Sequence, residues 1–124
     1  MLLQVLVVCA AACAGALLRW GLQLWLNPLT SVPLGTLTVN LVGGLLIGIA
    51  IAVFDALPDL NPAWRLMVIT GFLGTLTTFS SFSGEVVGML TQGRLGLALG
   101  TVGLHLGGSL LMTWAGFRVT RLFY

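Results

Sequence analysis

Four long hydrophobic runs, separated by short polar segments, occupy almost the whole sequence. They cover residues 2–26, 34–54, 63–90 and 93–117. The hydrocarbon core of a bilayer is about 30 Å thick, and a helix that crosses it needs about 20 apolar residues. Each run meets that length, so the pattern predicts an all-α membrane protein. Residues 1–124 then form a single transmembrane domain of four helices.

The third run differs from the others, because its middle is rich in glycine and in hydroxyl side chains. Residues 71–83 read GFLGTLTTFSSFS. Backbone groups inside a bilayer cannot bond to water, so non-helical backbone occurs there only where protein or an aqueous pathway surrounds it. We therefore expect the third helix to break in the middle of the membrane, near residues 74–79. The break is the expected functional site.

A break in a helix leaves carbonyl groups without partners on one side and amide groups without partners on the other. The carbonyl end is partially negative and suits a cation, whereas the amide end suits an anion. The break itself contains no carboxylate that could hold a cation. The backbone carbonyls of Gly74 and Thr77 are therefore the expected cation ligands.

Groups that attract an anion gather around the same break. Phe79 and Phe82 are three residues apart and share a helix face, and the edges of aromatic rings carry partial positive charge. Hydrogen-bond donors are offered by Thr36, Asn40, Ser80 and Ser81. This combination suits a small anion that has lost part of its water. The alternative is structural, since Phe pairs at this spacing often only pack and membrane Ser and Thr often bond to their own backbone.

Three further polar side chains lie inside the predicted helices. Asn40 either offers its amide donors to an anion or forms an interhelical hydrogen bond. Glu85 either lines a vestibule or reaches out from the end of its helix, and intramembrane carboxylates usually mark function. His105 begins a polar stripe with Ser109 and Thr113. A histidine in such a stripe is more typical of a hydrogen-bonded packing residue than of a proton relay.

The composition is that of an integral membrane protein, with 58% hydrophobic and 6% charged residues. Scattered arginines form no basic patch, which excludes nucleic-acid binding. With four spans, Arg65, Arg118 and Arg121 fall on one side of the membrane, and Arg19 and Arg94 on the other. The positive-inside rule has little bias to act on. We expect insertion in both orientations and head-to-tail pairing; the alternative is one orientation set by weak signals.

The cysteines and the single histidine do not indicate metal or redox chemistry. Cys9 and Cys13 lie four apart, and helix geometry directs their side chains along the axis rather than toward each other. We expect both to be buried as small hydrophobic side chains. The sequence has no Cys-x-x-Cys and no nucleophile with a base at hand, so we expect neither a transition-metal site nor an enzyme.

Long motifs make the chain resemble the Fluc (CrcB-like) fluoride channels over nearly its whole length. The matching pieces are Arg19-Trp20, GTLTVN at residues 35–40, GFLGTLTTFSSFSGE at residues 71–85 and HLGGSLLMTWAG at residues 105–116. The resemblance implies an antiparallel, dual-topology homodimer in the bacterial inner membrane. Such a dimer passes fluoride out of the cytoplasm passively, through two pores.

The resemblance also implies roles for individual residues. The ion pathway that it implies comprises Asn40, Phe79, Phe82, Thr36, Ser80, Ser81 and Ser109, with His105 and Glu85 nearby. It further implies a structural sodium ion (Na+) at the dimer centre, held by the carbonyls of Gly74 and Thr77. One position departs from the family. Thr75 stands where a second glycine is common, and a β-branched residue resists unusual backbone angles.

Two other functions are compatible with a small four-span chain. Small multidrug-resistance exporters share the length, the span count and dual insertion, but they exchange protons through a carboxylate in the first span. Residues 2–26 contain no Asp or Glu. A non-transporting subunit that anchors an enzyme complex would explain the apolar chain, but not the hydroxyl groups and glycines at the break.

Overall fold

The computed structural model describes residues 1–124 and contains only helices and their connections. Four helical stretches are long and apolar enough to cross a membrane, namely Leu2–Leu29, Leu34–Ala56, Pro62–Thr91 and Leu95–Thr120. This confirms the expected all-α architecture with four spans.

The elements along the chain are α1 (Leu2–Leu26), the 3₁₀ turn η1 (Asn27–Leu29), α2 (Leu34–Ala56), α3 (Pro62–Arg65), the π-helical segment η2 (Leu66–Leu73), α4 (Gly74–Leu76), α5 (Phe79–Thr91) and α6 (Leu95–Thr120). The third span thus consists of α3, η2, α4 and α5. The π-helical segment directly before the break was not expected from the sequence. Its last turn is marked by the bond from the Gly74 amide to the Ile69 carbonyl.

The fourth span begins at Leu95 rather than at residue 93. Gly93 has a φ of 72°, the left-handed conformation that glycine adopts without steric cost. The amide of Arg94 donates to the Met89 carbonyl at 2.9 Å, and the amide of Gly93 to the Leu90 carbonyl at 3.0 Å. These bonds close the C-terminus of α5, so Gly93 ends one helix instead of starting the next.

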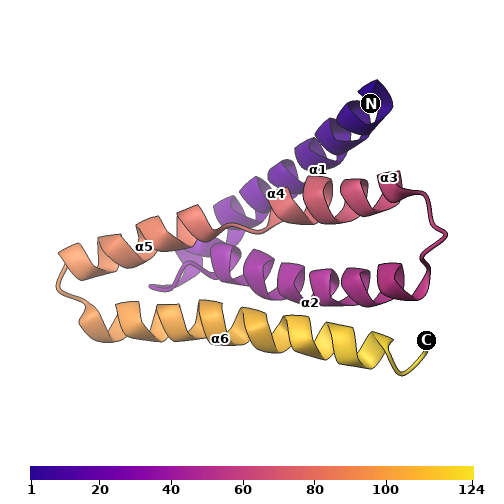
Figure 1. The fold of residues 1–124 in the computed structure, drawn as a ribbon. Helices are drawn as coiled ribbons and strands as arrows, with labels where there is room; N and C mark the ends of the chain where they lie inside the picture. Colours follow the sequence, from indigo (N-terminus) through magenta and orange to yellow (C-terminus); the bar gives the residue numbers. More distant parts are fainter.

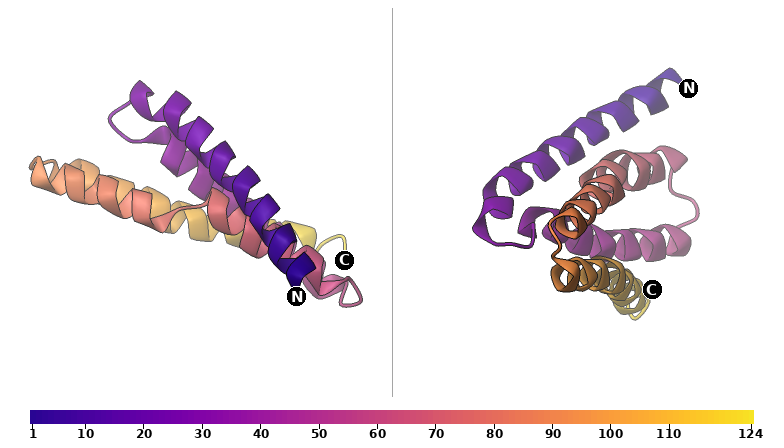
Figure 2. Two further views of the ribbon diagram at one scale, coloured as in Figure 1. Left: turned by 90° about the horizontal axis from the view of Figure 1, so that it is seen from above. Right: turned by 90° about the vertical axis from the view of Figure 1, so that its left-hand side faces the viewer.

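Helices α2 and α6 run side by side in the same direction, and the third span lies above them in the opposite direction (Figure 1). Helix α1 crosses the third span diagonally, as the two turned views show (Figure 2). Both chain termini and the α2–α3 connection lie at the same end of the molecule (Figure 1). This is the arrangement expected of four consecutive crossings.

The contact between α2 and α6 depends on glycines. A Cβ atom on Gly48 would overlap the Thr113 carbonyl, and one on Gly116 would overlap the Leu45 carbonyl. Because glycine has no Cβ atom, the two backbones can touch, which is the usual route to tight helix packing in membranes. The close approach brings the polar stripe of α6, which includes His105 and Ser109, against α2.

Helix α1 contacts the rest of the subunit through one narrow face. Gly15 packs on the Phe72 carbonyl and the Thr75 hydroxyl, and Gly71 faces Ala11. The cysteines lie on another face of α1. Both are free thiols and both are exposed on the subunit, so the expectation that they are buried was wrong. The small-residue face of α1 makes the closest contacts with the third span, because glycine and alanine allow the closest approach.

Candidate functional site

The third span is interrupted at Thr77 and Thr78, within the range expected from the sequence. Thr77 has φ and ψ of −80° and 157°, and Thr78 has −152° and 120°. Both residues are therefore extended, and they form the short link between α4 and α5 (Figure 1). The link lies near the middle of the span, far from both ends of the helix bundle.

The carbonyls of Gly74 and Thr77 are among the backbone groups that lose their helical donors at this link. In an unbroken helix the Thr78 amide would bond to the Gly74 carbonyl, but it donates to Asn40 Oδ1 at 2.8 Å. The Ser81 amide would bond to the Thr77 carbonyl, but it donates to Thr78 Oγ1 at 3.1 Å. The carbonyls of Gly74 and Thr77 are thus freed from the helical ladder, as a cation site of backbone oxygens requires.

Asn40 on α2 holds the link in place. Its Oδ1 accepts from the Thr78 amide, and its Nδ2 donates to the Thr78 carbonyl at 2.9 Å and lies 3.0 Å from His105 Nδ1. The side-chain amide replaces the ladder partners that Thr78 lacks. The sequence left two roles open for Asn40, and in the subunit it forms interhelical hydrogen bonds. Both hydrogens of its amide group are used in these contacts.

The contact with Asn40 also sets the tautomer of His105. An amide nitrogen only donates, so Nδ1 of a neutral His105 must accept and its proton lies on Nε2. His105 is buried, with 3% of its surface exposed, and Nε2 has no hydrogen-bond partner. The site therefore contains one buried N–H donor that the protein itself leaves unused.

The two phenylalanines on α5 lie in different environments. Phe82 is 5% exposed and stacks on His105, with ring centroids 4.5 Å apart and planes 22° apart. Phe79 is 70% exposed and meets Phe82 edge to face, at 5.4 Å and 72°. The rings share one helix face as expected. One ring belongs to the interior of the subunit and the other to its surface.

A cavity of about 320 Å³ lies beside the break. Among the residues that line it are Asn40, Thr77, Phe79, Phe82, His105 and Ser109. Since a water molecule takes about 30 Å³, the space can hold a small ion together with several waters. Parts of α2, the break, α5 and α6 therefore converge on one chamber in the membrane interior.

Thr36 and Glu85 belong to a second polar cluster outside this cavity. The Thr36 hydroxyl donates to Glu85 Oε1 and accepts from Gln23 Nε2 at 3.1 Å and Asn27 Nδ2 at 3.4 Å. Asn27 Oδ1 accepts from the amides of Gly35 and Thr36, which caps the start of α2. Glu85 Oε2 is buried without a partner. Gln23 and Asn27 were missed in the sequence, because a polar residue near a helix end normally reaches water.

Comparison with known proteins identifies the family. Residues 6–117 match the family described as CrcB-like protein, Camphor Resistance (CrcB). The chain belongs to the CrcB family. The fluoride-specific ion channel FluC of Paracidovorax citrulli is 70% identical over 118 residues, 95% of this chain and 94% of that protein. The channels of the same name from Variovorax paradoxus and Pseudomonas aeruginosa are 62% and 56% identical, over at least 90% of both chains. The resemblance recognised in the motifs is confirmed.

The remaining motif residues of this CrcB protein support the break. Thr78 caps α5, and its hydroxyl donates to Ser81 Oγ at 3.1 Å and lies 3.3 Å from Ser80 Oγ. Ser109 Oγ donates to the Asn40 carbonyl at 3.4 Å. Thr78 was not singled out in the sequence, although a threonine just before a helix is a common cap.

Thr75, where many CrcB relatives were expected to have glycine, does not strain the break. It lies in helical α4, and the extended backbone begins only at Thr77. Its hydroxyl shares one proton between the carbonyls of Gly71 at 2.7 Å and of Ala12 at 3.0 Å. Thr75 therefore fastens the third span to α1.

Proposed function

We propose that this protein is a passive, fluoride-selective channel that lets fluoride leave the cytoplasm across the bacterial inner membrane. The observation that carries the proposal is the chamber at the broken third span, which is lined by Asn40, Phe79, Phe82 and His105. The ion is taken from the relatives, which are named fluoride-specific ion channels. The lining of the chamber contains no carboxylate, which supports passive flow rather than a proton-coupled cycle.

Fluoride holds its water strongly, so a pore must offer replacements for hydration. The first amides of α5, those of Phe79 and Ser80, lie at the positive end of a helix that starts inside the membrane. His105 Nε2–H and the edges of Phe79 and Phe82 add further partial positive charge. None of these groups carries a full charge, so the ion can also leave. Hydroxyl groups of Ser80, Ser81 and Ser109 continue the pathway, and Thr36 and Glu85 form its outer part.

The active unit that we propose is an antiparallel homodimer with two pores. Its support is the surface that a single subunit leaves uncovered. Phe79 is mostly exposed, and a Cβ added to Gly96, Gly100, Gly103 or Gly107 on α6 would meet nothing within 4 Å. These glycines lie on one side of a membrane helix, where a second helix could approach closely. The near balance of arginines at the two ends supports opposite orientations.

A sodium ion between the two breaks is the expected structural metal. The carbonyls of Gly74 and Thr77 fit this role, since neither retains its helical donor, and oxygen atoms suit a hard alkali cation. The ion would supply positive charge that offsets the negative ends of the two broken helices. We expect sodium chloride to raise the melting temperature of the purified protein by about 5 °C over N-methylglucamine chloride of equal ionic strength. Equal melting temperatures in the two salts would contradict the sodium site.

The function is tested by reconstituting the purified protein in liposomes loaded with potassium fluoride. A fluoride electrode should record efflux once valinomycin allows potassium to follow, and no efflux from protein-free liposomes. Vesicles loaded with potassium chloride, followed with a chloride electrode, should show no chloride efflux. Efflux that requires a proton gradient would indicate an exporter, and absence of efflux from well-folded dimers would favour the anchor subunit.

A further inference from the structure

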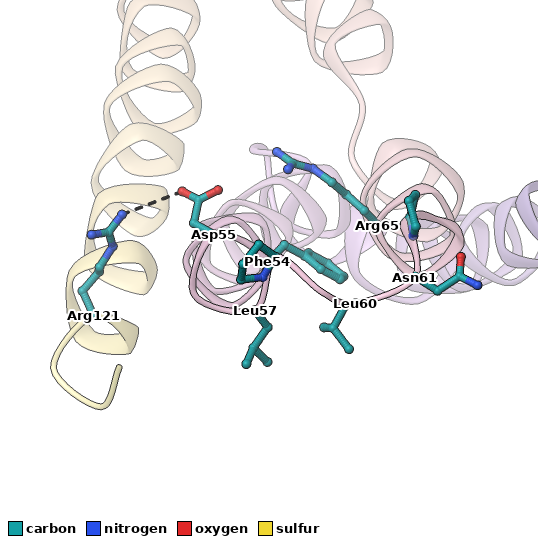
Figure 3. A pocket seen from close by; sticks show the side chains of 9 residues that line it. Phe54, Asp55, Leu57, Leu60, Asn61, Arg65 and Arg121 are labelled. Carbon is teal, nitrogen blue, oxygen red and sulfur yellow. Dashed lines mark ion pairs between the residues drawn. The ribbon is translucent and has the colours of Figure 1, made fainter.

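A second cavity, of about 620 Å³, lies at the end of the bundle where both chain termini are found. It is open to the outside and is bordered by the end of α2, the α2–α3 connection, α3 and the C-terminal end of α6 (Figure 3). It shares no lining residue with the chamber at the break. The two cavities are therefore separate spaces in the subunit.

The cavity contains more positive than negative charge. Arg65 enters from α3 and Arg121 from α6, with Asp55 as the only carboxylate among the lining residues (Figure 3). Arg121 Nη2 lies 3.8 Å from Asp55 Oδ2, well beyond the roughly 2.8 Å of a good charge-assisted hydrogen bond. Arg65 has no ion-pair partner in the chain. Both arginines line this space, and neither guanidinium group makes a close bond to a carboxylate.

The surroundings locate this cavity at the surface of the membrane. The second span ends beside it, at Ala56, and the third span begins beside it, at Pro62. Trp64, next to the cavity residue Arg65, is 54% exposed, and Trp114 lies under Arg118 at 6.0 Å. Exposed tryptophans beside arginines mark the headgroup level of a bilayer. The lower wall of the cavity is apolar and includes Leu57 and Leu60 (Figure 3).

We propose that this cavity binds the phosphate of an anionic phospholipid headgroup. The space of about 620 Å³ is large enough for a glycerophosphate group. Guanidinium forks match phosphate oxygens and are the preferred donors for phosphate. Basic pockets between the ends of transmembrane helices bind anionic lipid headgroups in this way. Arg65 is the main ligand, Arg121 the second, and Asp55 weakens the site.

Native mass spectrometry of the purified protein tests the proposal. The protein in neutral detergent receives an equimolar mixture of phosphatidylglycerol and phosphatidylcholine, and the bound lipids are counted. We expect the protein to bind phosphatidylglycerol in preference to phosphatidylcholine. Arg65→Gln should reduce this preference about tenfold, because it removes one charge-assisted contact. Asp55→Asn should increase the preference, because it removes the negative charge and releases Arg121.

Arg118→Gln is the matched control, since it removes the same charge at the same end but outside the cavity. It should keep the lipid preference of the unchanged protein. An equal loss in Arg65→Gln and Arg118→Gln would overturn the site, as would no preference in the unchanged protein. If soluble sn-glycerol 3-phosphate at millimolar concentration displaces phosphatidylglycerol, the site binds phosphate from water. If phosphatidylglycerol stays bound in its presence, the site binds the lipid. All variants should retain fluoride efflux, which shows that they are folded.

Discussion

In proteoliposomes, the Asn40→Asp variant should release fluoride at least about a hundredfold more slowly than the unchanged protein, a difference of about 2.7 kcal/mol in barrier height. Aspartate has the shape of asparagine but no donor. A carboxylate oxygen would replace Nδ2 at 2.9 Å from the Thr78 carbonyl and 3.0 Å from His105 Nδ1. The contact with the Thr78 carbonyl would become repulsive at the point that holds the break open, and His105 would keep its contact only with its proton moved to Nδ1, which removes the Nε2–H donor. The new charge would also repel an anion in the chamber.

Asn61→Asp provides the matched control for this change. Asn61 lies in the α2–α3 connection, and its Oδ1 accepts from the Ala63 amide at 2.9 Å, which an aspartate also does. Its fluoride efflux should equal that of the unchanged protein. Asn40→Ser, which keeps a hydroxyl donor without a charge, should fall between the two. Normal efflux through Asn40→Asp would show that the bonds to Thr78 and His105 are not needed for conduction.

Replacing Phe82 with isoleucine should lower fluoride efflux by about tenfold or more, the effect of losing about 1.4 kcal/mol of ion stabilisation. Isoleucine keeps an apolar side chain of similar bulk but has no partially positive ring edge. Phe82 also stacks on His105, and the Nε2 atom of His105 has no hydrogen-bond partner. Without the Phe82 ring, the imidazole would therefore be held less firmly. Phe79→Ile should likewise reduce efflux. The same fluoride-electrode assay measures both variants.

The control for the ring substitutions is Phe123→Ile, at an exposed aromatic residue near the C-terminus and away from the chamber. It should conduct normally. Both chamber variants should elute from a sizing column at the volume of the unchanged protein, because their side chains remain apolar. Undiminished efflux in Phe79→Ile and in Phe82→Ile together would refute the contribution of the ring edges.

The cluster around Thr36 illustrates what helix composition does not reveal. Thr36 and Glu85 are 49 residues apart, and the family resemblance implied that both lie on or near the ion pathway with Asn40. In the folded subunit Thr36 turns toward Gln23 and Asn27, at the junction of α1 and α2, while Asn40 faces the break. One helical turn along α2 separates two different polar environments.

The sequence by itself determined the four spans and the location of the break. Both follow from local composition, since apolar runs of sufficient length must cross the bilayer and clustered glycine and hydroxyl residues mark where a span can be interrupted. Only the tertiary structure decided which partners complete the break. The amide of Asn40 on α2 replaces the missing ladder bonds of Thr78, and His105 on α6 covers Phe82. Such contacts join residues far apart in sequence and depend on how each helix is rotated and how closely glycines let the backbones approach.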